Sequence, residues 1–146
     1  MQTTLLNKLH QHLQENYPDL LLDLQATGAV TGYLHSLMES LGNMPEELLA
    51  AGYPPYEVEE ICIEELLVKG VGPSKYNFFS SLLQDEFADA FNKWSEVGIL
   101  VFEIVNLIEL CKDVFEGYNF TEQSADDLVF VGKIKEKIGA YLMRLS

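Results

Sequence analysis

The chain of 146 residues carries 9 basic and 23 acidic side chains, a formal net charge of −14. This charge opposes non-specific binding to nucleic acid, which requires Lys and Arg to neutralise phosphates, and it opposes adsorption to anionic membranes. A hydrophobic content of 48%, with 11% aromatic residues, excludes a disordered chain, and the length suits a single domain over residues 1–146.

The first third of the chain predicts three helices separated by turn residues. Pro18 and Gly42 are expected to end the first two, and a leucine-rich turn over residues 20–24 lies between them. Polar residues just before each helix are expected to cap its free amides. The predicted helices, each with its expected cap, are residues 5–17 (Thr4), 28–41 (Thr27) and 45–51 (Asn43).

Residues 52–94 are expected to form the centre of the fold, as two amphipathic helices joined by a Gly/Pro hinge. The first begins at Pro54-Pro55, is apolar over most of its circumference, and ends at Gly70, the expected left-handed residue. The second begins after the cap Ser74. Its predicted core face repeats at spacings of three and four: Tyr76, Phe79, Leu83, Phe87, Ala90 and Trp94.

Two further helices are predicted over residues 96–115 and 126–145, the second capped by Ser124. No strand-like alternation of polar and apolar residues occurs anywhere in the chain. The predicted fold class is therefore all-α, an irregular multihelical bundle of about six helices in a single domain.

The first half of the 96–115 helix is apolar on nearly all sides, because Ile99, Phe102 and Val105 lie off its main apolar face. In the reading that we favour, the chain is a monomer and this helix is buried at its centre. In the alternative reading, these three side chains form the contact of a homodimer, in which one patch meets its own copy.

A family resemblance is carried by the stretches AGYPPYEVEEICIEELLVKG, SKYNFFSSLLQDEF and VFEGYNFTEQSADDLVFVGKIKEKIGAYL. In these, the chain resembles a small family of uncharacterised multihelical proteins from gut and oral anaerobic bacteria, whose members often travel with mobile genetic elements. Residues 71–73 depart from the family's usual bulkier, aromatic hinge. The resemblance implies a multihelical fold and no particular activity.

We find no catalytic motif and expect no cofactor, metal site or catalytic residue. Residues 70–75, GVGPSK, lack both the spacing and the preceding strand of a phosphate-binding loop. Cys62 and Cys111 lie on apolar helical faces with no histidine close in sequence, so we expect buried thiols in a reducing compartment.

Glutamates follow the first central helix in pairs, and we expect most of them to form a solvated stripe. Glu65 lies four residues before Lys69, which favours an ion pair on the helix surface. Glu59 instead projects among apolar residues and needs a partner if it is buried. Lys75, beyond the hinge, is the partner that we expect.

Turn residues supply the candidate binding surface. Lys75 and the free amides at a helix start favour weak anion binding, and tyrosines beside turns suit a binding surface. The tyrosines can equally close the ends of the bundle. The candidate partner or anion surface consists of Tyr53, Tyr56, Ser74, Lys75 and Tyr118.

The leading functional hypothesis is a non-enzymatic, acidic, cytoplasmic interaction or accessory protein that binds another protein. We expect no direct nucleic-acid binding and no membrane partner, because the net charge of −14 opposes both. The most apolar segment is also interrupted by Glu103, Asn106 and Glu109, so no membrane span is expected, and the first residues show no signal-peptide stretch. The alternatives are a small enzyme, with a site assembled from residues distant in sequence, and an acidic inhibitor that imitates DNA.

Overall fold

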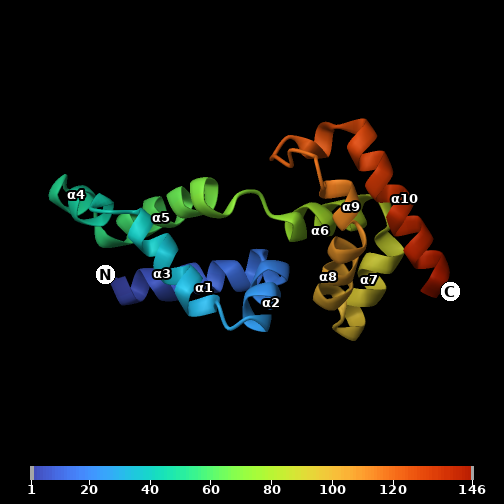
Figure 1. The fold of residues 1–146 in the computed structure, drawn as a ribbon, viewed down its shortest axis with the longest axis horizontal. Helices are drawn as coiled ribbons and strands as arrows, with labels where there is room; N and C mark the ends of the chain where they lie inside the picture. The colour runs from blue at the N-terminus through green and yellow to red at the C-terminus, as the bar shows by residue number, and fades with distance from the viewer. Residues whose placement is uncertain (1, 146) are drawn as a thin grey trace. The chain divides into compact units, whose positions relative to one another are not determined.

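A computed structural model of the chain describes residues 2–145, which form an all-α fold, as predicted (Figure 1). These residues contain ten α-helices, so the expectation of about six is wrong: two predicted helices are divided, and residues 18–26 form a helix where a turn was expected. The chain separates into two compact units, unit 1 up to Pro73 and unit 2 from Ser74. Each has its own hydrophobic cluster. That residues 1–146 form a single helical domain stays a prediction.

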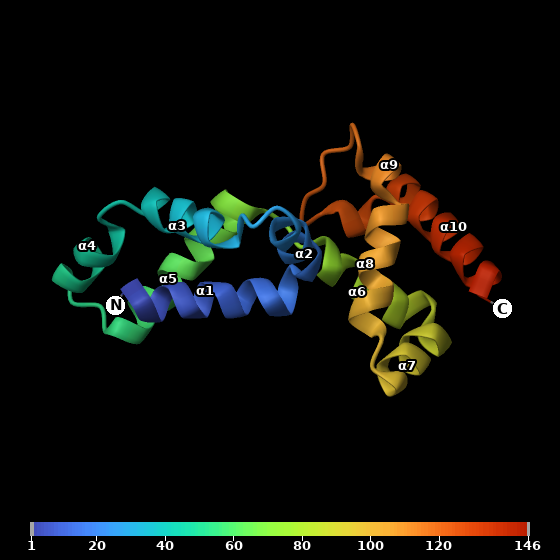
Figure 2. The ribbon, with the colours of Figure 1, turned by 60° about the horizontal axis from the view of Figure 1, so that its bottom comes forward.

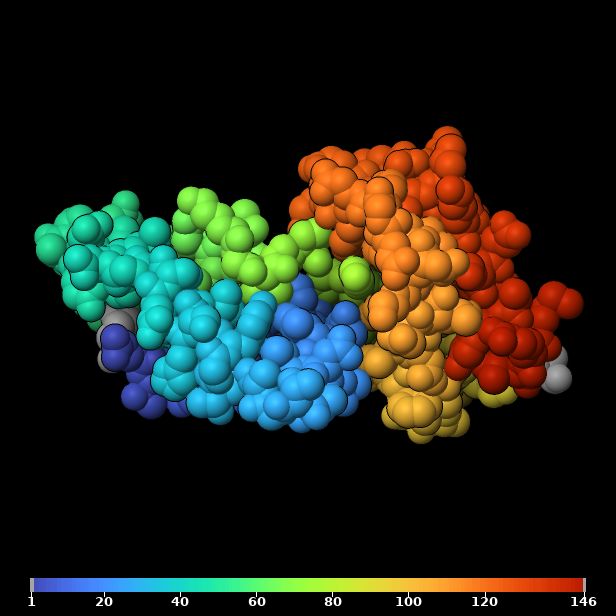
Figure 3. Space-filling view, viewed as in Figure 1, coloured from blue at the N-terminus to red at the C-terminus, as the bar shows by residue number. Residues whose placement is uncertain are grey.

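In unit 1, the first helix provides the main packing surface. It contacts the second, third and fifth helices (Figure 2). Its Leu5, Leu9 and Leu13 are fully buried. In Figure 3, the second and third helices form the layer of unit 1 that faces the viewer. The elements of unit 1 are α1 (Gln2–Asn16), α2 (Pro18–Ala26), α3 (Val30–Ser40), α4 (Met44–Ala50), α5 (Pro55–Glu65) and the π-helix η1 (Leu66–Val71).

The leucine-rich stretch after α1 is a helix, not the predicted turn. Pro18 opens α2, because its fixed φ angle and missing N–H suit the first turn of a helix. Thr27 consequently lies at the end of α2 and does not cap α3. Thr4 lies inside α1, and the Asn43 side chain makes no capping hydrogen bond to α4.

The end of α5 also differs from the prediction. The helix continues through η1, and Gly72, at φ 89°, takes the positive φ angle that was expected at Gly70. A Cβ atom at Gly70 would lie 2.7 Å from Cδ2 of Leu37 on α3. Gly70 therefore permits a close approach of η1 to α3. The Tyr17 hydroxyl donates a hydrogen bond to the Gly72 carbonyl at 2.6 Å.

In unit 2, the helices predicted over residues 75–94 and 96–115 are each divided into shorter helices. The first divides at Phe87 and the second at Gly98, which has a φ angle of 78°, and at Cys111. The expected Ser74 cap is confirmed, since its hydroxyl accepts a hydrogen bond from the Asn77 amide at 3.0 Å. The elements are α6 (Lys75–Glu86), α7 (Ala88–Val97), α8 (Leu100–Leu110), α9 (Lys112–Phe115), the 3₁₀-helix η2 (Ser124–Asp126) and α10 (Leu128–Leu145).

The core of unit 2 joins α6, α8 and α10. Phe79 of α6 is fully buried, whereas Phe87, predicted on the same face, is only half-buried because it lies in the break between α6 and α7. Trp94 of α7 is buried and meets the Tyr141 ring edge-on at 6.5 Å. The Tyr141 hydroxyl donates to a buried carboxylate, that of Glu103, at 2.8 Å.

Asp127, not the predicted Ser124, caps α10. The Asp127 carboxylate accepts hydrogen bonds from the Phe130 amide at 3.1 Å and from the Tyr118 hydroxyl at 2.9 Å. Ser124 is buried, and its hydroxyl accepts a hydrogen bond from the Thr121 amide. The Tyr118 ring stacks on the Phe130 ring, with 3.9 Å between the centroids. Tyr118 therefore contacts both the capping carboxylate and the core of unit 2.

Phe79→Ala should lower the free energy of unfolding by about 3–5 kcal/mol, because it removes a fully buried ring and leaves a cavity. Urea denaturation followed by circular dichroism measures this. The matched control is Phe102→Ala, which removes a ring that is 65% exposed and should cost less than about 1 kcal/mol. A loss that small at Phe79 would show that this face of α6 is not in the core.

The cap of α10 should make stability depend on pH. The Phe130 amide, and then the Tyr118 hydroxyl, hold the pKa of Asp127 below its ordinary value. The cap therefore stabilises the fold above the unfolded pKa of about 4, and its contribution is lost as the pH falls through the folded pKa. Asp127→Ala should lower the melting temperature at neutral pH, and the difference from wild type should shrink below about pH 4. The control is Asp126→Ala, on the neighbouring residue; a pH-independent effect of Asp127→Ala would contradict this cap.

Candidate functional site

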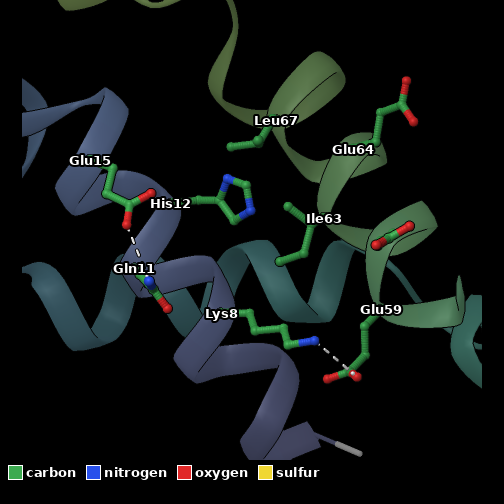
Figure 4. A pocket seen from close by; sticks show the side chains of 9 residues that line it. Lys8, Gln11, His12, Glu15, Glu59, Ile63, Glu64 and Leu67 are labelled. Atoms are coloured by element: carbon green, nitrogen blue, oxygen red, sulfur yellow. Dashed lines mark hydrogen bonds and ion pairs between the residues drawn. The ribbon is translucent and has the colours of Figure 1, made fainter. Parts of the chain in front are cut away.

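A groove between α1 and α5, with its η1 extension, is the candidate site, and it lies entirely within unit 1 (Figure 4). Its volume is about 550 Å³. Small-molecule binding sites have volumes of this order. The lining residues are Lys8, Gln11, His12, Glu15, Glu59, Glu60, Ile63, Glu64 and Leu67.

The two walls follow from helical spacing. Lys8, His12 and Glu15 lie four and three residues apart, so they form a stripe beside the buried leucines of α1. Glu59 and Ile63 lie four residues apart on α5 and face that stripe. Since α1 and α5 pack against each other, the core contact itself brings these two stripes together.

Glu59 is the least accessible charged group of the groove. The residue is 7% exposed, and one carboxylate oxygen, Oε1, lies 3.3 Å from the Lys8 ammonium. The other oxygen, Oε2, is buried, and none of the described residues donates a hydrogen bond to it. A buried carboxylate oxygen without a donor is costly, because water that would otherwise solvate it has been removed.

The remaining surface of the groove combines acidic and apolar groups. Glu60 and Glu64 are exposed on its α5 side, and Glu15 accepts a hydrogen bond from the Gln11 amide at 3.1 Å. Figure 4 shows the His12 ring pointing from α1 toward Ile63 and Leu67. Four carboxylates, one ammonium and one imidazole thus line the groove, together with the aliphatic side chains of Ile63 and Leu67. This arrangement suits a cationic group on an aliphatic stem.

The predicted partner of Glu59 is wrong. Glu59 pairs with Lys8 of α1, 51 positions earlier in the chain, and not with Lys75. Lys75 belongs to unit 2, where its ammonium lies 4.7 Å from the centre of the Phe115 ring. The other expected ion pair is confirmed, since Nζ of Lys69 lies 2.6 Å from Oε1 of Glu65.

The predicted partner or anion surface is divided between the units. Tyr53 and Tyr56 are exposed in unit 1, near the start of α5, and neither lines the groove. Ser74, Lys75 and Tyr118 belong to unit 2, where each already makes the contact described above: a helix cap, a ring contact and a stack with a hydrogen bond.

The predicted dimer contact lies on α8 and the turn before it. Phe102 is 65% exposed and Ile99 is 40% exposed, while Val105 is half-buried. The expectation that this helix is buried on all sides is therefore wrong, because α8 turns its Val101–Phe102 side to solvent and packs through Ile104 and Leu107. Both the monomer and the homodimer stay predictions.

Both cysteines are buried, as expected, which disfavours thiolate chemistry. Burial raises the pKa of Cys111 to about 11. Burial also raises the pKa of Cys62, and the nearby carboxylates of Glu46 and Glu65 raise it further. Because only the thiolate is a good nucleophile, neither group is activated at neutral pH.

Over the part of the chain that the structure describes, no three His, Cys, Asp or Glu side chains are grouped so as to hold a metal ion. Within the same residues, every helix is too short or too polar to cross a membrane. No protein-family model, curated protein or solved structure matches the chain. The family resemblance therefore stays a prediction, and the functional argument depends on the groove.

Proposed function

We propose that this chain is a non-enzymatic interaction protein whose α1–α5 groove binds a basic segment of another protein. The observation that carries the proposal is the Glu59 carboxylate, buried in the groove with one oxygen lacking a donor. A cationic side chain of a partner would supply that donor. Hydrogen bonds to a buried charge are among the stronger polar contacts, so such a side chain would anchor the complex.

The charge of the chain supports the same partner class. A net charge of −14 attracts basic proteins and speeds their encounter, and acids on the rim of a groove favour correct orientation. The Ile63 and Leu67 side chains offer an aliphatic surface for the stem of a Lys or Arg side chain. We place the protein in the cytoplasm, where it would act without direct nucleic-acid or membrane contact.

Catalysis has less support than binding. A general base must lie within hydrogen-bond reach of the group it activates, and a third group usually orients it. The two polar contacts drawn within the groove are Lys8–Glu59 and Gln11–Glu15, and neither involves His12 (Figure 4). The lining residues include no Ser, Thr or Cys. For a DNA-imitating inhibitor, no observation of comparable weight exists.

Glu59→Gln should weaken the binding of a short, fluorescein-labelled peptide of alternating Arg and Gly by about tenfold or more. The expectation follows because hydrogen bonds to charged groups contribute about 1.5–3 kcal/mol and 1.4 kcal/mol corresponds to tenfold in affinity. Fluorescence anisotropy at about 0.15 M salt measures the affinity, since exposed charges more than about 8 Å apart are then largely screened.

Two controls separate local recognition from general attraction. Glu47→Gln makes the same change in charge at an exposed position of α4, outside the groove, and should leave the affinity nearly unchanged. A peptide with citrulline in place of Arg keeps the shape, loses the charge and should not bind. Equal losses in Glu59→Gln and Glu47→Gln would contradict the proposal, because the peptide would then respond only to net charge.

A further inference from the structure

We infer that the groove is a site for an arginine side chain and that Lys8 occupies it from within the chain until the partner's guanidinium displaces it. This inference rests on the proposed function and adds two elements to it: the chemical group that binds and the internal competitor. The evidence is the unequal ion pair between Lys8 and Glu59.

The two members of this pair differ in how firmly the fold holds them. The Glu59 side chain is 10% exposed, whereas the Lys8 side chain is 46% exposed. Glu59 is surrounded on α5 by buried Val58, Cys62 and Ile63, so the helix cannot turn the carboxylate outward without exposing these residues. Lys8 can return its ammonium to water by side-chain rotation alone. The acceptor is therefore the buried member of the pair, and the cation is the member that solvent reaches.

Lys8 also satisfies the carboxylate only in part. Its ammonium contacts Oε1 at 3.3 Å, longer than most charge-assisted hydrogen bonds, and Oε2 has no donor among the described residues. An ammonium is a compact point charge. A guanidinium instead carries parallel N–H groups in one plane, which match both oxygens of a carboxylate at once. Arg is therefore the better occupant of this position than Lys.

The path of Lys8 shows where the arginine stem would lie. In Figure 4, the Lys8 side chain crosses from α1 toward α5 and ends at the Glu59 carboxylate, below Ile63. A partner residue that takes this position places its methylene groups against Ile63 and its guanidinium on Glu59. The exposed acids Glu60 and Glu64 remain free for a second basic residue of the same segment.

The test is a pair of substitutions at Lys8 with opposite expected effects. Lys8→Met removes the competitor and keeps the aliphatic stem, so affinity for the Arg/Gly peptide should rise roughly threefold to tenfold, as expected when a site that is mostly occupied becomes free. Lys8→Arg supplies a stronger internal competitor and should weaken peptide binding. The matched controls are Lys93→Met and Lys93→Arg, at an exposed position of α7, which should change affinity little.

Peptide chemistry tests the guanidinium. The Arg/Gly peptide should bind more tightly than the same peptide with Lys in place of Arg, and the preference should disappear in Glu59→Gln. Lys8→Met is expected to melt at a lower temperature than wild type without peptide, since it leaves Glu59 unpaired, and to gain more stability on peptide addition. If Lys8→Met does not fold, Lys8→Arg still decides the question, because it keeps the charge.

The outcomes separate this inference from the proposed function. If Glu59→Gln weakens binding but Lys8→Met weakens it too or leaves it unchanged, Lys8 supports the site and does not compete for it, and the inference is wrong. An equal affinity for Arg and Lys peptides overturns the guanidinium assignment. If the wild-type chain and all variants bind neither peptide, the proposed function itself fails.

Discussion

Packing of the α1 leucines against α5 determines which polar side chains of unit 1 can meet. Leu5, Leu9 and Leu13 are fully buried, and the helical repeat then places Lys8 and His12 immediately beside them. One wall of the groove is consequently α1 and the other is α5 with its η1 extension, and none of the lining residues comes from a loop. Sites built on packed helices are held in place by the same contacts that stabilise the fold.

Glu59 shows how the packing of these helices places a buried hydrogen-bond acceptor in the groove without a recognisable sequence motif. On α5 it lies beside the buried core residues Val58, Cys62 and Ile63. The Glu59 carboxylate therefore occupies a buried position of the kind that an apolar side chain usually fills. Its ion pair with Lys8 offsets part of the desolvation cost. The other carboxylate oxygen, Oε2, is buried and receives no hydrogen bond from the described residues.

The sequence predicted the helical class, the fully buried Phe79 and Leu83 of the α6 face, and the Ser74 cap, because these depend on spacing and on residues close to each other along the chain. It did not predict the groove. Lys8 and Glu59 belong to separate helices, and only the tertiary contact of α1 with α5 brings them together. The stripe of Lys8, His12 and Glu15 on α1 was a detectable pattern, but it resembles any solvated face. The breaks at Phe87 and Gly98 were missed because the apolar period continues across them.

Trp94, the one tryptophan of the chain, is buried in the core of unit 2. Intrinsic tryptophan emission therefore reports the solvation of unit 2 alone, while the far-ultraviolet dichroism of the helices reports both units. Unit 1 contains no tryptophan and therefore does not contribute to the tryptophan fluorescence. The two signals can therefore be compared in one denaturation experiment. If the fluorescence and dichroism curves coincide, the two hydrophobic clusters unfold together, and if the curves separate, the clusters unfold independently.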